Sequence, residues 1–215
     1  MGVALGDDIK EILEDVGAAF NIVQITTSPY SGEVAGGYCL IRPTLQSSRP
    51  LVRELVSEAQ FAFDTVVVNG DIINVPAIPQ KYLVLTKAPR VFENAIFSNP
   101  SMLYKANFSG ELQRFSGEGS GYDANYMSNV VPVAVQNPIY GTLADFDIQL
   151  TFEELAKVGE ISREDHVLYT PTVYGVREQD RIMRVSGELY YKVLGVTTAR
   201  FEGVSVCRIK EDYRK

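Results

Sequence analysis

Apolar residues in this chain gather in short runs rich in β-branched and aromatic side chains, and polar turn residues separate the runs. This pattern is typical of half-buried β-strands. The runs in the first half are FNIVQI, GGYCLIRP, KYLVLT and SMLYKANFSGEL, and those in the second half are HVLYTPTVYGV, DRIMRV, YYKVLGV and GVSVCRI. The pattern therefore predicts a mainly β protein of antiparallel strands.

Three segments have helical rather than strand-like spacing, namely residues 6–17, 47–60 and 151–159. The third opens with a capping box formed by Thr151 and Glu154. The predicted apolar faces comprise Ile9, Ile12, Leu13 and Val16 in the first segment and Leu51, Leu55, Val56 and Ala59 in the second. We therefore expect short helices among many strands, which is an α+β composition dominated by β.

The segment FDTVVVNGDIINV, residues 63–75, contains the strongest hairpin signal of the chain. Asn69-Gly70 can form a two-residue turn with positive φ, and apolar runs flank it on both sides. The sequence predicts two strands joined at this turn.

A partial internal repeat links residues 71–97 to the segment from residue 180 to residue 209 at a fixed offset of 109 positions. The seven identical pairs are Asp71/Asp180, Ile73/Ile182, Tyr82/Tyr191, Val84/Val193, Leu85/Leu194, Phe92/Phe201 and Glu93/Glu202. Either two related domains share an ancestral unit, or two short β-meanders share composition. Alternation in YLVL and YKVL predicts that Tyr82 and Val84 lie on one face, and Tyr191 and Val193 likewise.

The order of elements supports the first reading, because each half has strands, a short helix and then a run of antiparallel strands. We predict two tandem small antiparallel β-barrel-like domains, at residues 1–114 and 138–215. Between them, residues 115–137 are polar, rich in glycine and without period. This segment is either an interdomain linker or a long projecting loop.

Composition excludes several classes of protein. The 215 residues suffice for one large domain or two small ones, and no apolar run approaches the roughly 20 residues needed to span a bilayer. The amino terminus lacks the pattern of a signal peptide. A net charge of −7, with basic residues scattered singly, argues against tight binding to nucleic-acid phosphates.

Candidate chemistry is sparse. His166 is the single histidine, and no G-x-S-x-G nucleophile accompanies it, so we interpret it as a surface residue. Cys39 and Cys207 lie far apart in strand-like runs and are expected to be buried free thiols. The GEGSG stretch lacks the Lys-Ser/Thr ending of a phosphate-binding loop. We therefore predict no catalytic residue, no metal site and no cofactor, although an enzyme with an unrecognised site remains an alternative.

The residues from Asp180 to Arg214 follow the arrangement D-R-I … Y-Y-K-V … R-F-x-G-V … R-I-K-E-D-x-R. This arrangement resembles the small β-barrel proteins of tailed-bacteriophage necks and tails, which include head-closure (stopper), head-tail joining and tail-completion proteins. The resemblance covers about 35 residues well and residues 71–107 more loosely. Two features depart from the family pattern: the chain has two predicted barrels, and its N-terminal helix leads into strands instead of a helical hairpin.

The resemblance implies a structural virion protein, assembled in the host cytoplasm, that forms a homo-oligomeric ring at the neck and joins head to tail. The ring is expected to be a hexamer that contacts a portal or adaptor ring and tail terminator or tube proteins. DNA would pass through its channel without specific binding, and no membrane is involved. The alternatives are a tail terminator, a baseplate component or a non-viral tandem-barrel binding module.

Subunit contacts are expected in the segment between the domains. Ordering a glycine-rich excursion costs about 1–2 kcal/mol per residue in backbone entropy, which an isolated domain does not recover. The segment nevertheless carries Phe115, Tyr122, Tyr126 and Met127, whose types favour interface cores. We predict that these four side chains become ordered against a neighbouring subunit.

Overall fold

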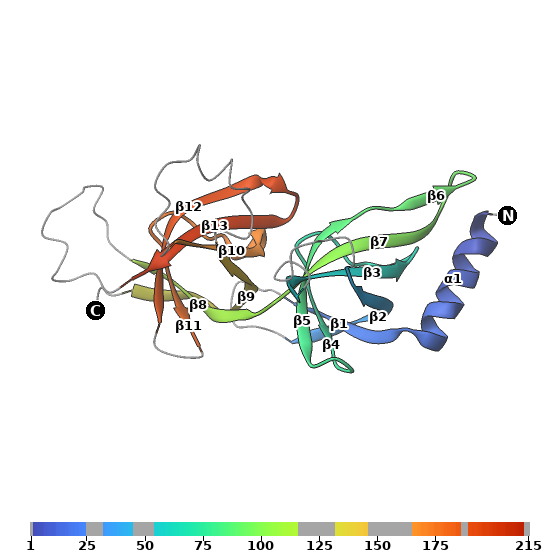
Figure 1. Ribbon diagram of the computed structural model, residues 1–215, viewed down its shortest axis with the longest axis horizontal. Helices are drawn as coiled ribbons and strands as arrows, with labels where there is room; N and C mark the ends of the chain where they lie inside the picture. The colour runs from blue at the N-terminus through green and yellow to red at the C-terminus, as the bar shows by residue number, and fades with distance from the viewer. Residues whose placement is uncertain are drawn as a thin grey trace, which may run out of the picture.

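The computed structural model describes residues 2–24, 32–44, 54–115, 132–145, 165–185 and 189–212. These residues form two closed six-stranded antiparallel β-barrels and one α-helix, arranged along the long axis of the molecule (Figure 1). The two ends of the chain lie near opposite ends of this axis. The predicted fold class, tandem small β-barrels, is confirmed.

The first barrel contains six strands in the closed order β3-β2-β1-β4-β5-β7, with β3 and β7 pairing to complete the circle. A short strand β6 adds a hairpin to one end of β7. The bounds are β1 Ala18–Val23, β2 Glu33–Pro43, β3 Val56–Ala62, β4 Ile72–Val75, β5 Gln80–Lys87, β6 Arg90–Phe92 and β7 Ala95–Lys105.

The second barrel closes in the order β10-β13-β12-β11-β8-β9. A 3-10 helix, η2 (Thr172–Tyr174), follows β10. The bounds are β8 Phe108–Phe115, β9 Pro132–Asp145, β10 Asp165–Pro171, β11 Arg181–Arg184, β12 Tyr190–Phe201 and β13 Val204–Glu211.

The two barrels have the same topology. When β1 to β5 and β7 are matched in chain order with β8 to β13, every pair of neighbouring strands in one barrel has a counterpart in the other. The register agrees as well, since Ile73 lies opposite Tyr82 and Ile182 lies opposite Tyr191. The repeat found in the sequence therefore marks the same structural position twice.

The identical aspartates of the repeat perform the same task at the entry to β4 and β11. The carboxylate of Asp71 accepts a hydrogen bond from the Val68 amide at 2.8 Å, and that of Asp180 accepts one from the Arg177 amide at 2.8 Å. Each aspartate carbonyl then accepts the amide of the valine in the next strand at 2.9 Å. Both pairs of residues are separated by the offset of 109. The aspartates are thus turn residues that start the second half of each barrel.

The interiors of the barrels also correspond. Tyr82 and Val84 point into the first core, as the alternation predicts, and Tyr191 and Val193 point into the second. The first core comprises Phe20, Cys39, Ala59, Phe61, Val67, Ile73, Val75, Tyr82, Val84 and Leu103. The second comprises Phe108, Leu112, Ile139, Leu168, Tyr174, Val176, Ile182, Tyr191, Val193, Cys207 and Ile209.

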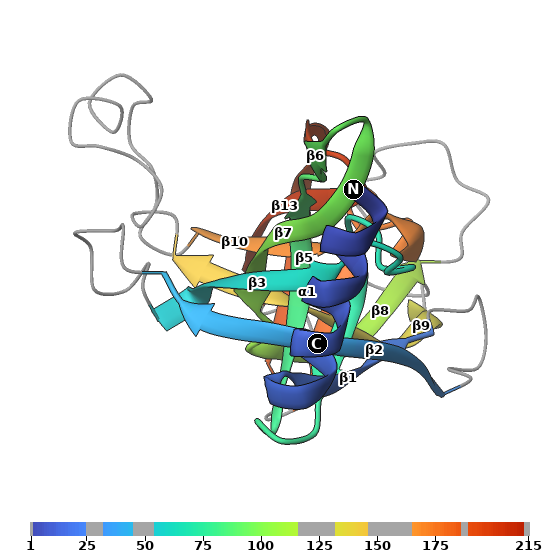
Figure 2. The same ribbon diagram turned by 90° about the vertical axis from the view of Figure 1, so that its right-hand side faces the viewer.

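The predicted N-terminal helix exists as α1 (Gly2–Val16), and the Gly17 amide closes its last turn on the Leu13 carbonyl at 2.9 Å. It lies against β7, β2 and β3 (Figure 2). The predicted apolar face is wrong in part, because Leu13 is buried whereas Ile12 and Val16 are exposed. Within the described residues, no helix is long and apolar enough to cross a membrane.

Two local predictions are wrong. Residues 56–60, expected at the end of a helix, form most of β3, because pairing with both β2 and β7 outweighs their weak helical spacing. Asn69-Gly70 does not join two strands, since residues 65–68 are in no strand. The Gly70 amide instead donates to the Val84 carbonyl of β5 at 2.8 Å. Residues 47, 48, 50 and 51 and the third predicted helix at 151–159 lie outside the described residues.

The position of the domain boundary also differs from the prediction. The first domain was expected to extend to residue 114, yet β8 begins at Phe108 and pairs with β9 and β11 in the second barrel. The chain therefore crosses between barrels at Ala106 and Asn107. Residues 116–131, most of the predicted linker or projecting loop, lie outside the described residues. The strands on either side of them, β8 and β9, both belong to the second barrel.

The barrels meet through a third apolar cluster. The first barrel contributes Val23, Ile72, Leu83 and Leu85, and the second contributes Val167, Tyr169 and Val204. The rings of Tyr104 and Tyr169 pack edge to face across the interface with centroids 5.0 Å apart. Each of these side chains points away from its own barrel core, so the cluster joins the two barrels into one unit.

Two glycines allow the backbones of the barrels to touch beside this cluster. A Cβ on Gly203 would lie 2.1 Å from the Asn69 carbonyl oxygen, and a Cβ on Gly70 would lie 2.1 Å from the Gly203 oxygen. Both glycines also have positive φ, at 73° and 89°. Any other residue would push the barrels apart.

Candidate functional site

The histidine and the two cysteines considered in the sequence analysis lie apart from one another in the structure. His166 lies in β10, half-buried, with its ring centroid 6.0 Å from that of Tyr191 in an edge-to-face contact. Cys39 and Cys207 are buried free thiols in different barrels, as predicted, and burial raises the pKa of each to about 12. A thiol with such a pKa is almost entirely protonated at neutral pH and is a poor nucleophile. Among the described residues, no group of three or more His, Cys, Asp or Glu side chains could hold a metal ion.

The Asp-Arg-Ile stretch builds a buried ion pair. Asp180 has a side chain only 4% exposed, and Arg114 donates to its two oxygens at 2.9 and 2.8 Å. This bidentate contact raises the pKa of Arg114. The same guanidinium also donates to the Gly175 carbonyl at 2.9 Å. The charge of Asp180 is therefore matched within its own barrel and fixes the turn before β11.

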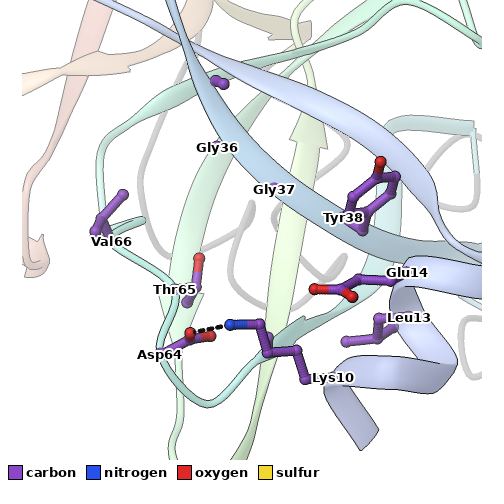
Figure 3. A pocket seen from close by; sticks show the side chains of 11 residues that line it. Lys10, Leu13, Glu14, Gly36, Gly37, Tyr38, Asp64, Thr65 and Val66 are labelled. Carbon is purple, nitrogen blue, oxygen red and sulfur yellow. Dashed lines mark hydrogen bonds and ion pairs between the residues drawn. The ribbon is translucent and has the colours of Figure 1, made fainter. Parts of the chain in front are cut away.

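A cleft of about 360 Å³ opens between α1, β2 and the segment after β3 (Figure 3). Lys10 reaches across it to Asp64 with an Nζ–Oδ2 distance of 2.6 Å, and this hydrogen bond raises the pKa of Lys10. Tyr38, Glu14 and Thr65 complete its polar lining. Lys10 and Asp64 are each more than 40% exposed, so the pair is solvated.

Glycine backbone in β2 forms one wall of this cleft. The register of β1 and β2 shifts between Phe20 and Asn21, which leaves Gly36 without a direct partner in a β-bulge. A Cβ at Gly36 would lie 2.1 Å from the Phe20 ring. The core phenylalanine therefore fills the space beside the bulge, and the cleft stays lined by backbone on that side. The cleft therefore combines a solvated Lys10–Asp64 ion pair with a wall of glycine backbone.

Equivalent outward positions on the two barrels have different chemistry. On the first barrel, the row formed by paired residues of β4, β5 and β7 is Ile72, Leu83 and Tyr104. On the second barrel, the same row is Arg181, Lys192 and Lys210. We call this row face A of each barrel. Face A is apolar where it is buried against the other barrel. On the second barrel it is charged, with Asp165 directly opposite Lys210 and Asp212 beside Arg181.

The opposite side of each barrel shows the reverse pattern. On the second barrel, Val167, Tyr169 and Val206 lie on β10 and β13 and contact the first barrel. Strand pairing matches them to Glu58, Gln60 and Pro100 on β3 and β7. We call this side face B. On the first barrel, α1 lies against the strands of face B, so the helix occupies the place that a preceding barrel would take.

Several large apolar side chains are exposed at the α1 end of the molecule. The hairpin β6–β7 carries Val91, Phe92 and Ile96 at 60%, 49% and 43% exposure. Its counterpart, the hairpin β12–β13, holds Phe201 and Val204 in the cluster between the barrels. Both hairpins project in the same direction along the long axis (Figure 1). At the offset of 109, Phe92 corresponds to Phe201, so the first hairpin exposes a phenylalanine whose counterpart packs between the barrels.

The interface residues predicted from sequence are only partly described. Phe115 is the last residue of β8, where its backbone pairs with Pro132. Tyr122, Tyr126 and Met127 lie outside the described residues. The sequence analysis did not predict the exposed hairpin β6–β7 or the difference between face A of the first barrel and face A of the second. The sequence of a single strand does not reveal which of its faces a second domain covers.

Comparison with known proteins gives no family. No protein-family model matches the chain, and no curated protein matches it. Among solved structures, MrkH from K. pneumonia in its apo state aligns over 100% of this chain and 86% of its own length, at 8% identity and a TM-score of 0.21. That score is too low to indicate a common fold.

Proposed function

We propose that this chain is a structural virion protein of a tailed phage, which forms a ring at the neck and joins the head to the tail around the DNA channel. The observation that carries the proposal is the Asp180 turn with Ile182 and Tyr191. These are the residues of the resemblance, and they build the barrel instead of a reactive centre. A resemblance carried by barrel-building residues supports kinship of fold and assembly more than shared chemistry.

The surface of the chain agrees with a role in assembly. The described residues offer a shallow ion-paired cleft and exposed apolar side chains on α1 and on the hairpin β6–β7. Exposed apolar groups rimmed by charge are typical of protein–protein contacts. A net charge of −7 also suits a wall along which DNA moves without adhering. In this proposal the subunits form a homo-oligomeric ring, hexameric in the related family, between a portal or adaptor ring and tail terminator or tube proteins.

The test uses particles of the phage or prophage whose genome encodes the chain. Antibody raised against the purified protein should decorate the junction of head and tail in electron micrographs. Inactivation of the gene should leave filled heads and finished tails that do not join, and a plasmid copy should restore joined particles. Absence of the chain from purified particles would refute the proposal, and decoration at the tail tip would favour a baseplate role.

A further inference from the structure

The cleft beside α1 lies where β2 has a neighbouring strand on one side only. Residues 33–39 of β2 pair with β1, but pairing with β3 begins at Cys39. Among the described residues, no strand pairs with residues 33–38 on the side away from β1, and residues 35–38 line the cleft there. β3 ends at Ala62, whose carbonyl accepts the Thr65 amide at 3.3 Å as the chain turns away. The cleft therefore exposes an edge strand in an otherwise closed barrel.

The backbone of this edge directs hydrogen-bonding groups into the cleft. The Gly32 carbonyl accepts the Gln24 amide at 3.0 Å, so Gly32 faces β1. Residues of an antiparallel strand face alternate edges, so the amide and carbonyl of Ala35, three residues further on, face the other way. The β-bulge follows at Gly36, and a Cβ on Gly37 would have nothing within 4 Å. Another strand can thus approach this part of the edge closely.

The second barrel closes the equivalent edge with two side-chain hydroxyls. Tyr140 of β9 is the counterpart of Tyr38, since each precedes the residue opposite the first residue of β8 or β1. The Tyr140 amide donates to the hydroxyl of Tyr174 at 3.1 Å, and the Tyr140 carbonyl accepts from the hydroxyl of Thr170 at 3.0 Å. The second barrel therefore satisfies this position of β9 from β10 and η2.

The first barrel has neither hydroxyl. At the offset of 109, Thr65 stands in place of Tyr174, and Phe61 stands in place of Thr170. Thr65 lines the cleft, and its shorter side chain accepts a backbone amide of its own segment at 3.4 Å. Phe61 is fully buried in the core. Within the described residues, no hydroxyl therefore caps the amide of Tyr38, and the cleft opens at the position that corresponds to Tyr174.

The side chains around the edge indicate what fits there. The lining carries the carboxylates of Glu14 and Asp64 and one cation, Lys10, which is bound to Asp64 at 2.6 Å. The lining is therefore acidic even with Lys10 counted, and the Glu14 carboxylate points into the cleft (Figure 3). α1 adds four further exposed carboxylates and no other basic residue. Val66, at the rim, is 70% exposed. These surroundings favour an extended segment with basic and apolar side chains.

We propose that the edge of β2 binds an extended segment of a partner protein, in which lysine or arginine alternates with apolar residues, as a strand added to the first barrel. The backbone of the segment pairs with Ala35 and Tyr38, and a basic side chain pairs with Glu14. Backbone bonds of this kind supply affinity, and the flanking side chains supply selectivity. This inference goes beyond the neck function and does not depend on it, because the edge and the cleft belong to a single subunit.

The test uses a fluorescein-labelled peptide of alternating valine and lysine, blocked at both ends, and measures its binding to the full chain by fluorescence anisotropy. The same peptide with every backbone nitrogen methylated keeps its charge and side chains but cannot donate to β2. It should bind about 10-fold more weakly. A peptide of alternating valine and glutamate should bind more weakly than the lysine peptide, because Glu14 and the carboxylates of α1 repel it.

Variants of the chain locate the bound peptide. Ala35→Pro removes an amide that points away from β1, so it spares the ladder between β1 and β2. Thr65→Tyr gives the first barrel the hydroxyl that Tyr174 provides in the second. Each should weaken binding of the lysine peptide about 10-fold. Thr65→Val is the matched control and should bind as the wild type does. Glu14→Gln should weaken binding severalfold. Circular dichroism and the melting temperature verify that every variant is folded.

The proposal is overturned if the lysine peptide does not bind, or if full methylation of its backbone or Ala35→Pro leaves its affinity unchanged. Attraction between charges alone would then account for any binding. Sedimentation velocity of the protein without peptide tests for another occupant: a dimer that Ala35→Pro dissociates would place a second copy of this chain on the edge and would also overturn the proposal. The neck function is tested separately on particles and stands or falls independently of these results.

Discussion

The two barrels have similar cores, but equivalent positions on their outer surfaces differ in polarity. Five core positions correspond and hold similar side chains in both barrels, namely Val67/Val176, Ile73/Ile182, Tyr82/Tyr191, Val84/Val193 and Leu103/Ile209. On the outside, Leu83 corresponds to Lys192, and Tyr169 corresponds to Gln60. Each apolar member of these pairs lies between the barrels, and each polar member lies away from that interface. The comparison teaches that packing inside a barrel preserved the repeat, while contact between barrels made its copies diverge.

Truncation of equivalent side chains on face A should give the largest difference in stability between the two barrels. Leu83→Ala removes a fully buried side chain from the cluster between the barrels and should lower the free energy of unfolding by about 2–5 kcal/mol. Lys192→Ala, at the equivalent position on face A of the second barrel, should change the free energy of unfolding by no more than about 0.5 kcal/mol. Urea denaturation of both variants measures the difference. Equal losses would mean that face A is not an interface in the first barrel.

The glycine contact between the barrels offers the next largest effect. Gly203→Ala forces a residue with Cβ into φ 73°, which costs about 1–2 kcal/mol, and the overlap with the Asn69 carbonyl adds about 1–3 kcal/mol. Gly175→Ala is the matched control, because φ there is 61° and nothing lies within 4 Å of the added carbon. The control should show only the first of these losses. Thermal unfolding of the two variants separates steric overlap from backbone strain.

The equivalent aspartates Asp71 and Asp180 allow the turns of the two barrels to be compared. Asp180→Asn breaks the bidentate contact with Arg114 and should destabilise the protein by about 1–3 kcal/mol. Asp71→Asn should be nearly neutral at pH 7, because the new amide oxygen can still accept the Val68 amide. Chemical denaturation at pH 7 measures both, and equal losses would show that Arg114 adds nothing to the second turn.

A smaller effect should appear in the pH dependence of the Asp71 variant. Burial raises the pKa of Asp71 above its ordinary value near 3.8, so the folded protein holds this proton more tightly than the unfolded chain. The wild type therefore loses the corresponding stability as pH rises through the raised pKa. Asp71→Asn removes this dependence, and its stability relative to the wild type should rise between acidic and neutral pH. A difference that is constant with pH would contradict the raised pKa.

Sequence reasoning identified the repeat because its identical residues serve the barrel interior and the turns. Asp71, Ile73 and Tyr82 recur at one offset, since the turn and the two following strands have the same length in both barrels. The preceding strands do not follow that offset: pairing with β4 and β11 matches Ile22 to Leu112. The boundary between barrels was therefore placed too late in the chain.

The errors in local structure have a common physical cause. Val56 and Ala59 are spaced as on a helix, yet two neighbouring strands pair with this segment and hold it extended. Leu83 and Leu85 gave no sign of an interface, because a continuous apolar run is equally compatible with a strand buried on both faces of one sheet. The open edge of β2 became visible only when strand pairing aligned the two barrels.

Alkylation of cysteines placed at equivalent outward positions tests the central claim most directly. Leu83→Cys and Lys192→Cys are compared under native conditions, and the wild type provides a low background because Cys39 and Cys207 are buried with raised pKa. The account predicts rapid labelling at position 192 and labelling at position 83 only as fast as the protein unfolds. Equal labelling rates at both positions, in folded variants, would contradict the claim that the two barrels share an interior and differ in what covers their outer faces.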